Sequence, residues 1–129
     1  MKNLIISVMV LLGTIPISGC LDLASDTSRD VNVIANVPSP NQSYVATSYS
    51  MMGGGAAGWC YVYVKVRKQN EGFNPEGDVV FGTRCNVEPE LKWQGEKRLS
   101  IAYPRDVTVN TQEKMRGGDE AVEISYVPK

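Results

Sequence analysis

The chain has 129 residues, with 13 Lys and Arg against 14 Asp and Glu, and it contains no His. This length is expected for one domain, and the formal net charge of −1 argues against a nucleic-acid partner, which would need a concentrated basic face. The absence of His removes the commonest general base and the commonest zinc ligand, which argues against catalysis.

Residues 1–20 have the layout of a secretory signal peptide. They begin with Lys2, continue as an apolar run over 4–12 that is too short to span a bilayer, and then turn to small and weakly polar residues. A buried helix is disfavoured there by Pro16 and Gly19. The segment ends in a motif that resembles the lipobox of bacterial lipoproteins, formed by Ile17, Ser18, Gly19 and Cys20.

The lipobox resemblance implies a lipid anchor on Cys20. In that family the cysteine thiol is diacylglycerated, the chain is cleaved just before the cysteine, and the new amino group is usually acylated as well, typically with palmitate. Several acyl chains anchor strongly, since each buried methylene contributes ~0.8 kcal/mol. Gram-negative lipoproteins with Asp directly after the cysteine stay in the inner membrane. Leu21 stands there in this chain, so in a Gram-negative host the resemblance implies the outer membrane, facing the periplasm.

The anchor divides the chain into three parts. We expect a signal peptide over 1–19, a lipidated tether over 20–30 and a single β domain over 31–129. The tether segment is polar and poor in large apolar residues, as is typical of a linker. Cleavage would remove Lys2 and leave 12 basic against 14 acidic side chains.

Cys60 and Cys85 remain once Cys20 is assigned to the anchor. An even pair in an exported chain predicts a disulfide, because the compartment is oxidising. Closing a loop of about 26 residues would stabilise the fold by roughly 3.5 kcal/mol on the chain-entropy model. A redox role is disfavoured, since reactive pairs usually lie close together in a C-x-x-C motif.

A hydrophobic period of two dominates from residue 31 onward, and no convincing amphipathic helix of ten residues occurs. The pattern therefore predicts an all-β fold, a small antiparallel meander or sandwich of six to eight short strands. The expected strands cover 31–37, 43–50, 59–68, 79–85, 90–93, 98–103, 106–110 and 121–127. The expected core residues are Val62, Val64, Val66, Val79, Phe81, Leu91, Leu99, Ile101, Val122 and Ile124.

Two hairpin segments, SPNQSYVATSYS over 39–50 and KWQGEKRLSIAYP over 92–104, share a tight turn followed by alternating apolar positions. They resemble the hairpins of TolB-type propeller blades and of small uncharacterised periplasmic lipoproteins. A propeller is excluded by size, because each blade needs ~40 residues and at least four blades are required. The resemblance to the small lipoproteins implies no established activity.

The glycine tract over 53–58 has the spacing of a phosphate-binding loop at Gly53 and Gly58. The residues that follow are Trp59 and Cys60, where phosphate chemistry needs Lys and a hydroxyl, and a strand follows where a helix should begin. We interpret the tract as a mobile loop that leads into the strand over 59–68.

Enzymatic and metal-binding motifs are weak throughout the chain. The mature part has no S-x-x-K pattern for a serine nucleophile, and the GGDE segment over 117–120 lacks the spacing of a calcium loop. Carboxylate pairs could in principle serve a glycosidase, but such residues are usually solvated. We therefore expect no catalytic residue, metal or cofactor. The carboxylate pairs are Glu88 with Glu90 and Asp119 with Glu120.

The strand over 59–68 offers the best candidate for binding. Alternation places Cys60 with Val62, Val64 and Val66 on one face, which would direct both cysteines of the disulfide into the core. The opposite face is either a partner-binding patch or is covered by another part of the fold. That face carries Trp59, Tyr61, Tyr63, Lys65 and Arg67.

Together these patterns predict a lipid-anchored cell-envelope protein, not an enzyme, that binds a protein partner or has a structural role in the periplasm. One alternative is an inhibitor or immunity protein that inserts the loop over 50–58 into a periplasmic hydrolase or toxin. Another alternative, from a different class, is a small carboxylate-dependent hydrolase.

Overall fold

The computed structural model describes residues 29–112, 115–116 and 122–129. The expected signal peptide, Cys20 and all but the last two tether residues lie outside the described residues. The prediction of an all-β fold is confirmed, since the described ranges contain, besides strands, a single turn of 3-10 helix, η1. The elements are β1 Asp30–Pro38, β2 Tyr44–Gly53, η1 Gly55–Ala57, β3 Trp59–Lys68, β4 Phe81–Arg84, β5 Glu90–Gly95, β6 Arg98–Tyr103, β7 Val109–Gln112, β8 Met115–Arg116 and β9 Val122–Pro128.

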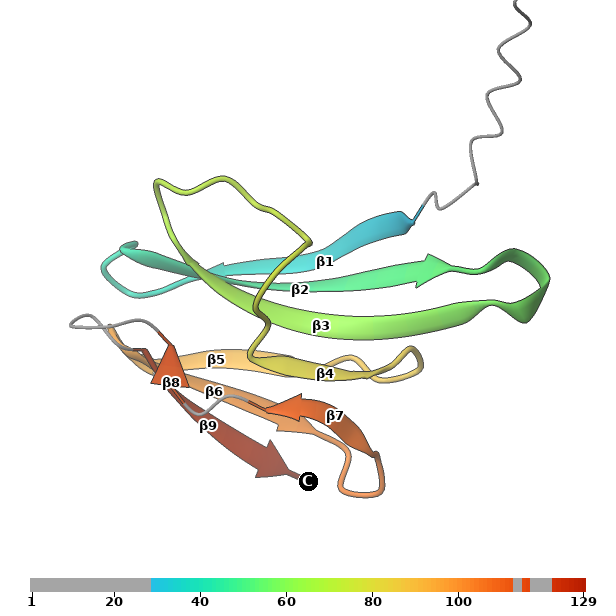
Figure 1. Cartoon of the computed structure of the whole chain (residues 1–129). Coiled ribbons are helices and arrows are strands. Elements are labelled where there is room, and N and C mark those ends of the chain that lie inside the picture. Colours follow the sequence, from blue (N-terminus) through green and yellow to red (C-terminus); the bar gives the residue numbers. More distant parts are fainter. Residues whose placement is uncertain (1–28, 113–114, 117–121) are drawn as a thin grey trace, which may run out of the picture.

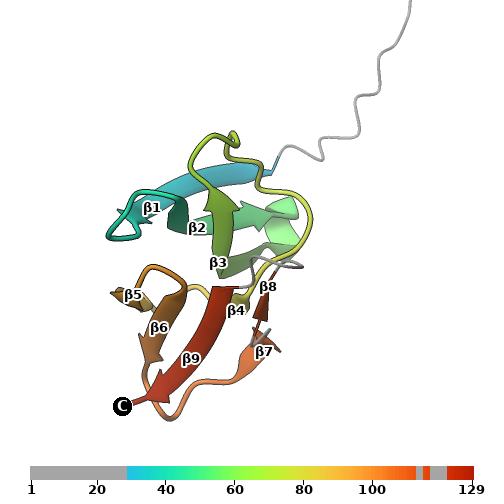
Figure 2. The same ribbon diagram turned by 90° about the vertical axis from the view of Figure 1, so that its left-hand side faces the viewer.

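The strands form two sheets packed as a sandwich (Figure 1). One is five-stranded with the order β1-β2-β3-β4-β7, and all its pairs are antiparallel. The other is four-stranded with the order β5-β6-β9-β8. A quarter turn of the view shows β1 and β2 in one layer and β5, β6 and β9 in the other (Figure 2).

The core lies between the two sheets, because each strand turns one alternate set of side chains inward. Val64 and Phe81 of the first sheet and Leu99 and Ile101 of the second are at most 1% exposed. Eight of the ten expected core residues are buried. The full buried cluster is Tyr44, Ala46, Val64, Val66, Val80, Phe81, Leu99, Ile101, Val122 and Ile124.

The expected core residues Val79 and Leu91 are only half-buried, and Val80 is fully buried instead. The reason is that the expected strand over 79–85 shortens to β4, and the chain joins the sheet through the Val80 N–H, which donates to the Val64 carbonyl at 2.9 Å. Val80 therefore points into the sandwich before the regular alternation of β4 begins. Leu91 packs against the edge of the core.

One pairing was not anticipated from the sequence. β9 runs parallel to β6, with Arg98 opposite Glu123 and Tyr103 opposite Pro128. Parallel neighbours need a long connection, and here the connection contributes β7 to the first sheet and β8 to the second. Along the chain, β6 therefore belongs to the second sheet, β7 to the first and β8 again to the second.

Candidate functional site

β3 separates its side chains as its alternation predicts, with Val62, Val64 and Val66 buried. The strand register extends the opposite face across the sheet, because residues paired across antiparallel strands point to the same side. On this outer face Tyr61 pairs with Met51 and Arg84, and Met51 pairs with Val31. This row across the outer face is thus apolar from Val31 to Tyr61 and ends at the exposed Arg84.

Three rings form a continuous row on this face, which we call the aromatic row: Trp59, Tyr61 and Tyr63. The ring centroids of Trp59 and Tyr61 are 6.0 Å apart, and those of Tyr61 and Tyr63 are 6.1 Å apart. The interplanar angles of 35° and 32° are those of tilted neighbours, within the separation at which aromatic pairs stabilise each other. All three side chains are half-buried, so part of each ring faces solvent.

The other end of the outer face is covered by the chain itself. Residues 69–80, which we call the covering loop, cross this end of β2 and β3 (Figure 1). The ring of Phe73 packs edge-on against Tyr49 with centroids 5.0 Å apart, and the Tyr49 hydroxyl donates to the Pro75 carbonyl at 3.0 Å. Tyr49 is fully buried as a result and lies 5.7 Å from the ring of Tyr63. The covering loop therefore ends where the aromatic row begins.

Lys65 and Arg67 both face the covering loop. Lys65 is only 8% exposed, and its ammonium donates to the backbone carbonyls of Asn74 and Glu76. Arg67 is half-buried and donates to the Glu71 carbonyl at 3.3 Å. The structure therefore gives both cations an intramolecular role in holding the loop and leaves the aromatic row as the accessible part of the predicted patch.

The two tyrosines at the boundary of the covering loop, Tyr49 and Tyr63, have raised pKa values. Burial, followed by repulsion from Tyr63 and from Glu76, raises the pKa of Tyr49 from 10.0 to about 12. Burial and then Tyr61 raise the pKa of Tyr63, and Arg29 opposes the rise. Arg29 also forms an exposed ion pair with Glu76 at 2.9 Å. Both hydroxyls are therefore protonated donors at neutral pH.

The glycine tract leaves room for the indole ring of Trp59 to pack against the backbone. A β-carbon at Gly53 would stand 2.9 Å from the Cζ2 atom of the indole, and one at Gly54 would stand 3.0 Å from its Cδ1 atom. Gly54 also has a φ of +86°, in the left-handed region that favours glycine. The interpretation of the tract as a loop entering a strand is refined: β2 continues to Gly53, and η1 closes the turn. The glycines are required so that the indole can lie on the backbone.

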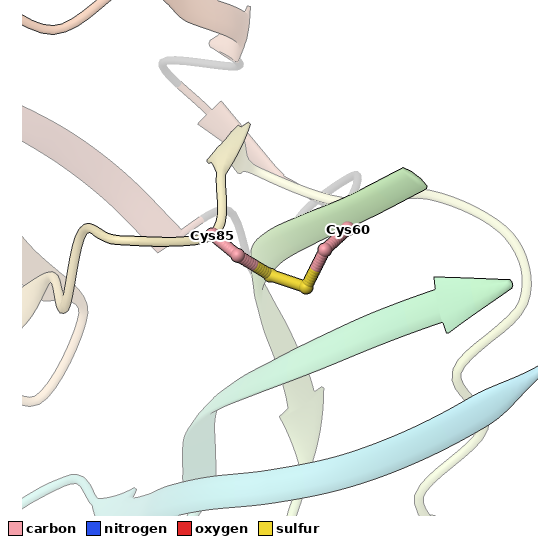
Figure 3. Close-up of a disulfide and its surroundings, with 2 residues drawn as sticks. All are labelled: Cys60 and Cys85. Carbon is pink, nitrogen blue, oxygen red and sulfur yellow. A yellow bond between two sulfur atoms is a disulfide. The ribbon is translucent and has the colours of Figure 1, made fainter. Parts of the chain in front are cut away.

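Cys60 and Cys85 form a disulfide between β3 and the residue that follows β4 (Figure 3). Their Cα atoms are 5.3 Å apart, and the Cys85 N–H donates to the Cys60 carbonyl at 3.2 Å. Both cysteines are half-buried, at the margin of the sandwich, whereas the alternation placed them in the core. The difference arises because the β2–β3 hairpin extends beyond the second sheet at this end (Figure 1).

Shallow depressions flank Trp59 on both sides near the disulfide. One is lined by Asp30, Met52 and the glycine tract, and the other by Tyr61, Arg84 and Asn86. Asn86 has a φ of 104°, which is uncommon for any residue other than glycine and is often retained at functional sites. Arg84 and Asn86 could not be selected from the sequence, because Arg84 comes beside the aromatic row through its pairing with Tyr61 and Asn86 through the turn after β4.

The carboxylate pair Glu88 and Glu90 lies on the surface. Both residues are exposed, and the Glu90 carboxylate forms an ion pair with the Lys129 ammonium. The other pair, Asp119 and Glu120, lies outside the described residues. In the described ranges, no group of three or more His, Cys, Asp and Glu side chains is placed to hold a metal ion.

The helices of the described ranges include none that is both long and apolar enough to cross a membrane. Comparison of the chain with protein-family models, with curated proteins and with solved structures finds no match.

Proposed function

We propose that this chain is a lipid-anchored cell-envelope protein whose β domain binds a protein partner through the aromatic row. The lipid on Cys20 would hold the protein at the outer membrane, facing the periplasm. The tether would set how far the β domain extends from the membrane. The role is one of display and binding without catalysis. The lipobox motif supports the location, and the geometry of the outer face supports the binding surface.

The observation that carries the proposal is the contrast between the two ends of the outer face. The covering loop buries Tyr49 completely, whereas Trp59 and Tyr61 remain half-exposed and lie beside the exposed Arg84. Trp, Tyr and Arg are the residues most enriched at the energetic centres of protein interfaces. The face therefore presents an aromatic and cationic surface of the composition that protein partners recognise.

A photo-crosslinking residue at Tyr61 tests this surface in intact cells. The expected result is capture of a defined envelope protein, and the same residue at Val127, which is 41% exposed on the other sheet, is the matched control. The variant pair Trp59→Ser and Tyr61→Ser should abolish co-purification while the Cys60–Cys85 disulfide and the thermal transition persist. Equal capture from both positions, or none from Tyr61 at native expression, would refute the binding surface.

The anchor is tested separately by metabolic labelling with a palmitate analogue. We expect label on the wild-type chain and none on Cys20→Ala, which should also leave the membrane fraction. Leu21→Asp should move the protein to the inner membrane of a Gram-negative host. Labelling of Cys20→Ala would contradict a lipid at that cysteine.

A second candidate function, inhibition of a periplasmic hydrolase or toxin, is favoured by the β2–β3 hairpin. Its tip over 54–58 is exposed and projects past the second sheet (Figure 1). Ala56→Glu at the tip should then abolish inhibition while leaving capture through Tyr61 intact. The reverse result, loss of binding only on substitution of Trp59 and Tyr61, would assign the partner to the aromatic row.

A further inference from the structure

The free edge of the five-stranded sheet is unevenly protected. Within the described part of the chain, β1 is an edge strand that pairs only with β2. Near its end, the Val37 carbonyl accepts a hydrogen bond from Trp93 Nε1 at 2.8 Å, and Pro38 has no N–H to offer. Among the described residues, no group outside the β1–β2 ladder hydrogen-bonds to 30–34, which we call the open edge.

The open edge is also apolar. Val31 is 38% exposed, Val33 is 42% exposed, and Ile34 is 36% exposed. Proteins usually protect such edges with charged residues, proline, a β-bulge or a cover, and the stretch from Val31 to Val33 contains no charged residue, no Pro and no bulge. A β-bulge at Ile34 interrupts its far end, so 30–33 is the regular part, on the side where the chain enters the domain.

We propose that the open edge pairs antiparallel with the same segment of a second copy of this chain. A two-fold axis through Asn32, perpendicular to the sheet, places Val31 opposite Val33 of the second copy and Val33 opposite its Val31. Apolar residues directly opposite each other stabilise strand pairs, and both valines lie on the outer face. The segment is therefore complementary to itself.

The pairing of apolar side chains favours this register. With the axis at Asn32, the Asp30 residues of the two copies lie at opposite ends of the paired segment, each toward the β-bulge at Ile34 of the other copy. An axis at Val31 would instead place Arg29 opposite Val33. Only the register at Asn32 pairs the two valines with each other, and it also places no like charges directly opposite one another.

The position of the open edge in the chain favours a second copy over an unrelated strand. It begins at residue 30, ten residues after Cys20. This argument rests on the proposed anchor: copies tethered to one membrane would present the edge at a similar height and a raised effective concentration. Pairing would place the aromatic rows of both copies on one face of a continuous sheet, so that the dimer would present two binding surfaces.

Cysteine crosslinking of the full chain in membranes tests the register. Asn32→Cys should form a disulfide-linked dimer on mild oxidation, because directly opposite Cα atoms in antiparallel strands lie ~4.5 to 5.5 Å apart, within disulfide range. Val31→Cys and Val33→Cys should each dimerise weakly alone but crosslink when mixed, because the register places 31 opposite 33. Val127→Cys, exposed on the other sheet, is the control. Retention of the Cys60–Cys85 disulfide checks folding.

Several outcomes would overturn the proposal. They are equal dimerisation of Val127→Cys and Asn32→Cys, crosslinking of Asn32→Cys to a different protein, and a folded Asn32→Cys that stays monomeric. A second measurement uses no new cysteine: sedimentation of the detergent-solubilised chain should shift from twice the monomer mass to the monomer mass on Val33→Lys. A wild-type chain that sediments as a monomer would contradict the dimer. Capture through Tyr61 reports on the proposed function independently.

Discussion

The indole ring of Trp59 lies against the backbone of Gly53, so closely that a β-carbon at position 53 would stand 2.9 Å from the ring. This contact fixes the first ring of the aromatic row to the end of β2. The orientation of the proposed binding surface therefore depends on a residue that contributes no side chain to it.

Gly53→Ala should displace the Trp59 ring and lower the free energy of unfolding by about 1 kcal/mol, because the half-exposed indole can move aside. The checks are the fluorescence of Trp59 in a Trp93→Phe background and chemical denaturation. Gly72→Ala is the matched control, since a β-carbon there meets nothing within 4 Å and its φ is not in the left-handed region. An unchanged emission spectrum in Gly53→Ala would show that the ring does not rest on the glycine.

Lys65→Met should release the covering loop. The substitution keeps most of the buried stem but removes the donor to the Asn74 and Glu76 carbonyls, and hydrogen bonds from a charged donor contribute about 1.5 to 3 kcal/mol each. We expect a loss of about 2 to 3 kcal/mol in denaturation and new protease cleavage within 69–80. Lys92→Met, at an exposed position on β5, should change neither measurement.

Alkaline pH should destabilise the fold through Tyr49. Its pKa is raised from 10.0 to about 12, so the unfolded chain loses this proton first as the pH rises. The free energy of unfolding should be insensitive to this group below about pH 10 and should fall between pH 10 and 12. Tyr63 contributes in the same direction, since its pKa is also raised.

Absorbance of tyrosinate against pH provides the measurement for Tyr49. We expect the native protein to show one tyrosine deprotonation step near pH 12, and we expect this step to be absent in Tyr49→Phe. The same variant should show a weaker dependence of stability on pH between 10 and 12. A late step that survives Tyr49→Phe would assign the shifted pKa to another tyrosine.

Removal of the disulfide by the double substitution Cys60→Ser and Cys85→Ser should lower the free energy of unfolding by about 3.5 kcal/mol, because the cross-link restricts the unfolded chain. Both cysteines are half-buried, so a small thiol should also reduce the wild-type bond without global unfolding. Denaturation of the reduced wild-type chain and of the double variant should then give the same midpoint. A reduced chain as stable as the oxidised one would contradict this contribution.

The sequence predicted the strands best where apolar and polar residues alternate without interruption. β3 and β6 begin and end where the alternation does, over 59–68 and 98–103. The pattern failed at Val79, Val80 and Phe81, since three consecutive apolar residues do not define which side faces inward. The backbone hydrogen bond from the Val80 N–H to the Val64 carbonyl determines which of these side chains face inward, and this bond depends on tertiary packing.

The candidate site was predicted in part. Alternation placed Trp59, Tyr61 and Tyr63 together on the outer face, and the structure brings them into one row. The packing of the covering loop could not be predicted, because its contacts join residues far apart in sequence. Phe73, a single aromatic residue in a polar segment, was the one local signal that the loop packs against something.

The parallel pairing of β6 with β9 has a consequence for the order of folding. The first three strands, β1 to β3, can pair one after another as hairpins of neighbouring segments. The pairing of β6 with β9 instead brings together Arg98 and Glu123, which are 25 positions apart in the chain. Contacts between distant segments form slowly, because the chain loses conformational entropy when the loop closes and only afterwards gains the stabilising contacts. We therefore expect the three-stranded meander to form first and the second sheet to close in the slow step, leaving the inner face of the meander transiently open to solvent.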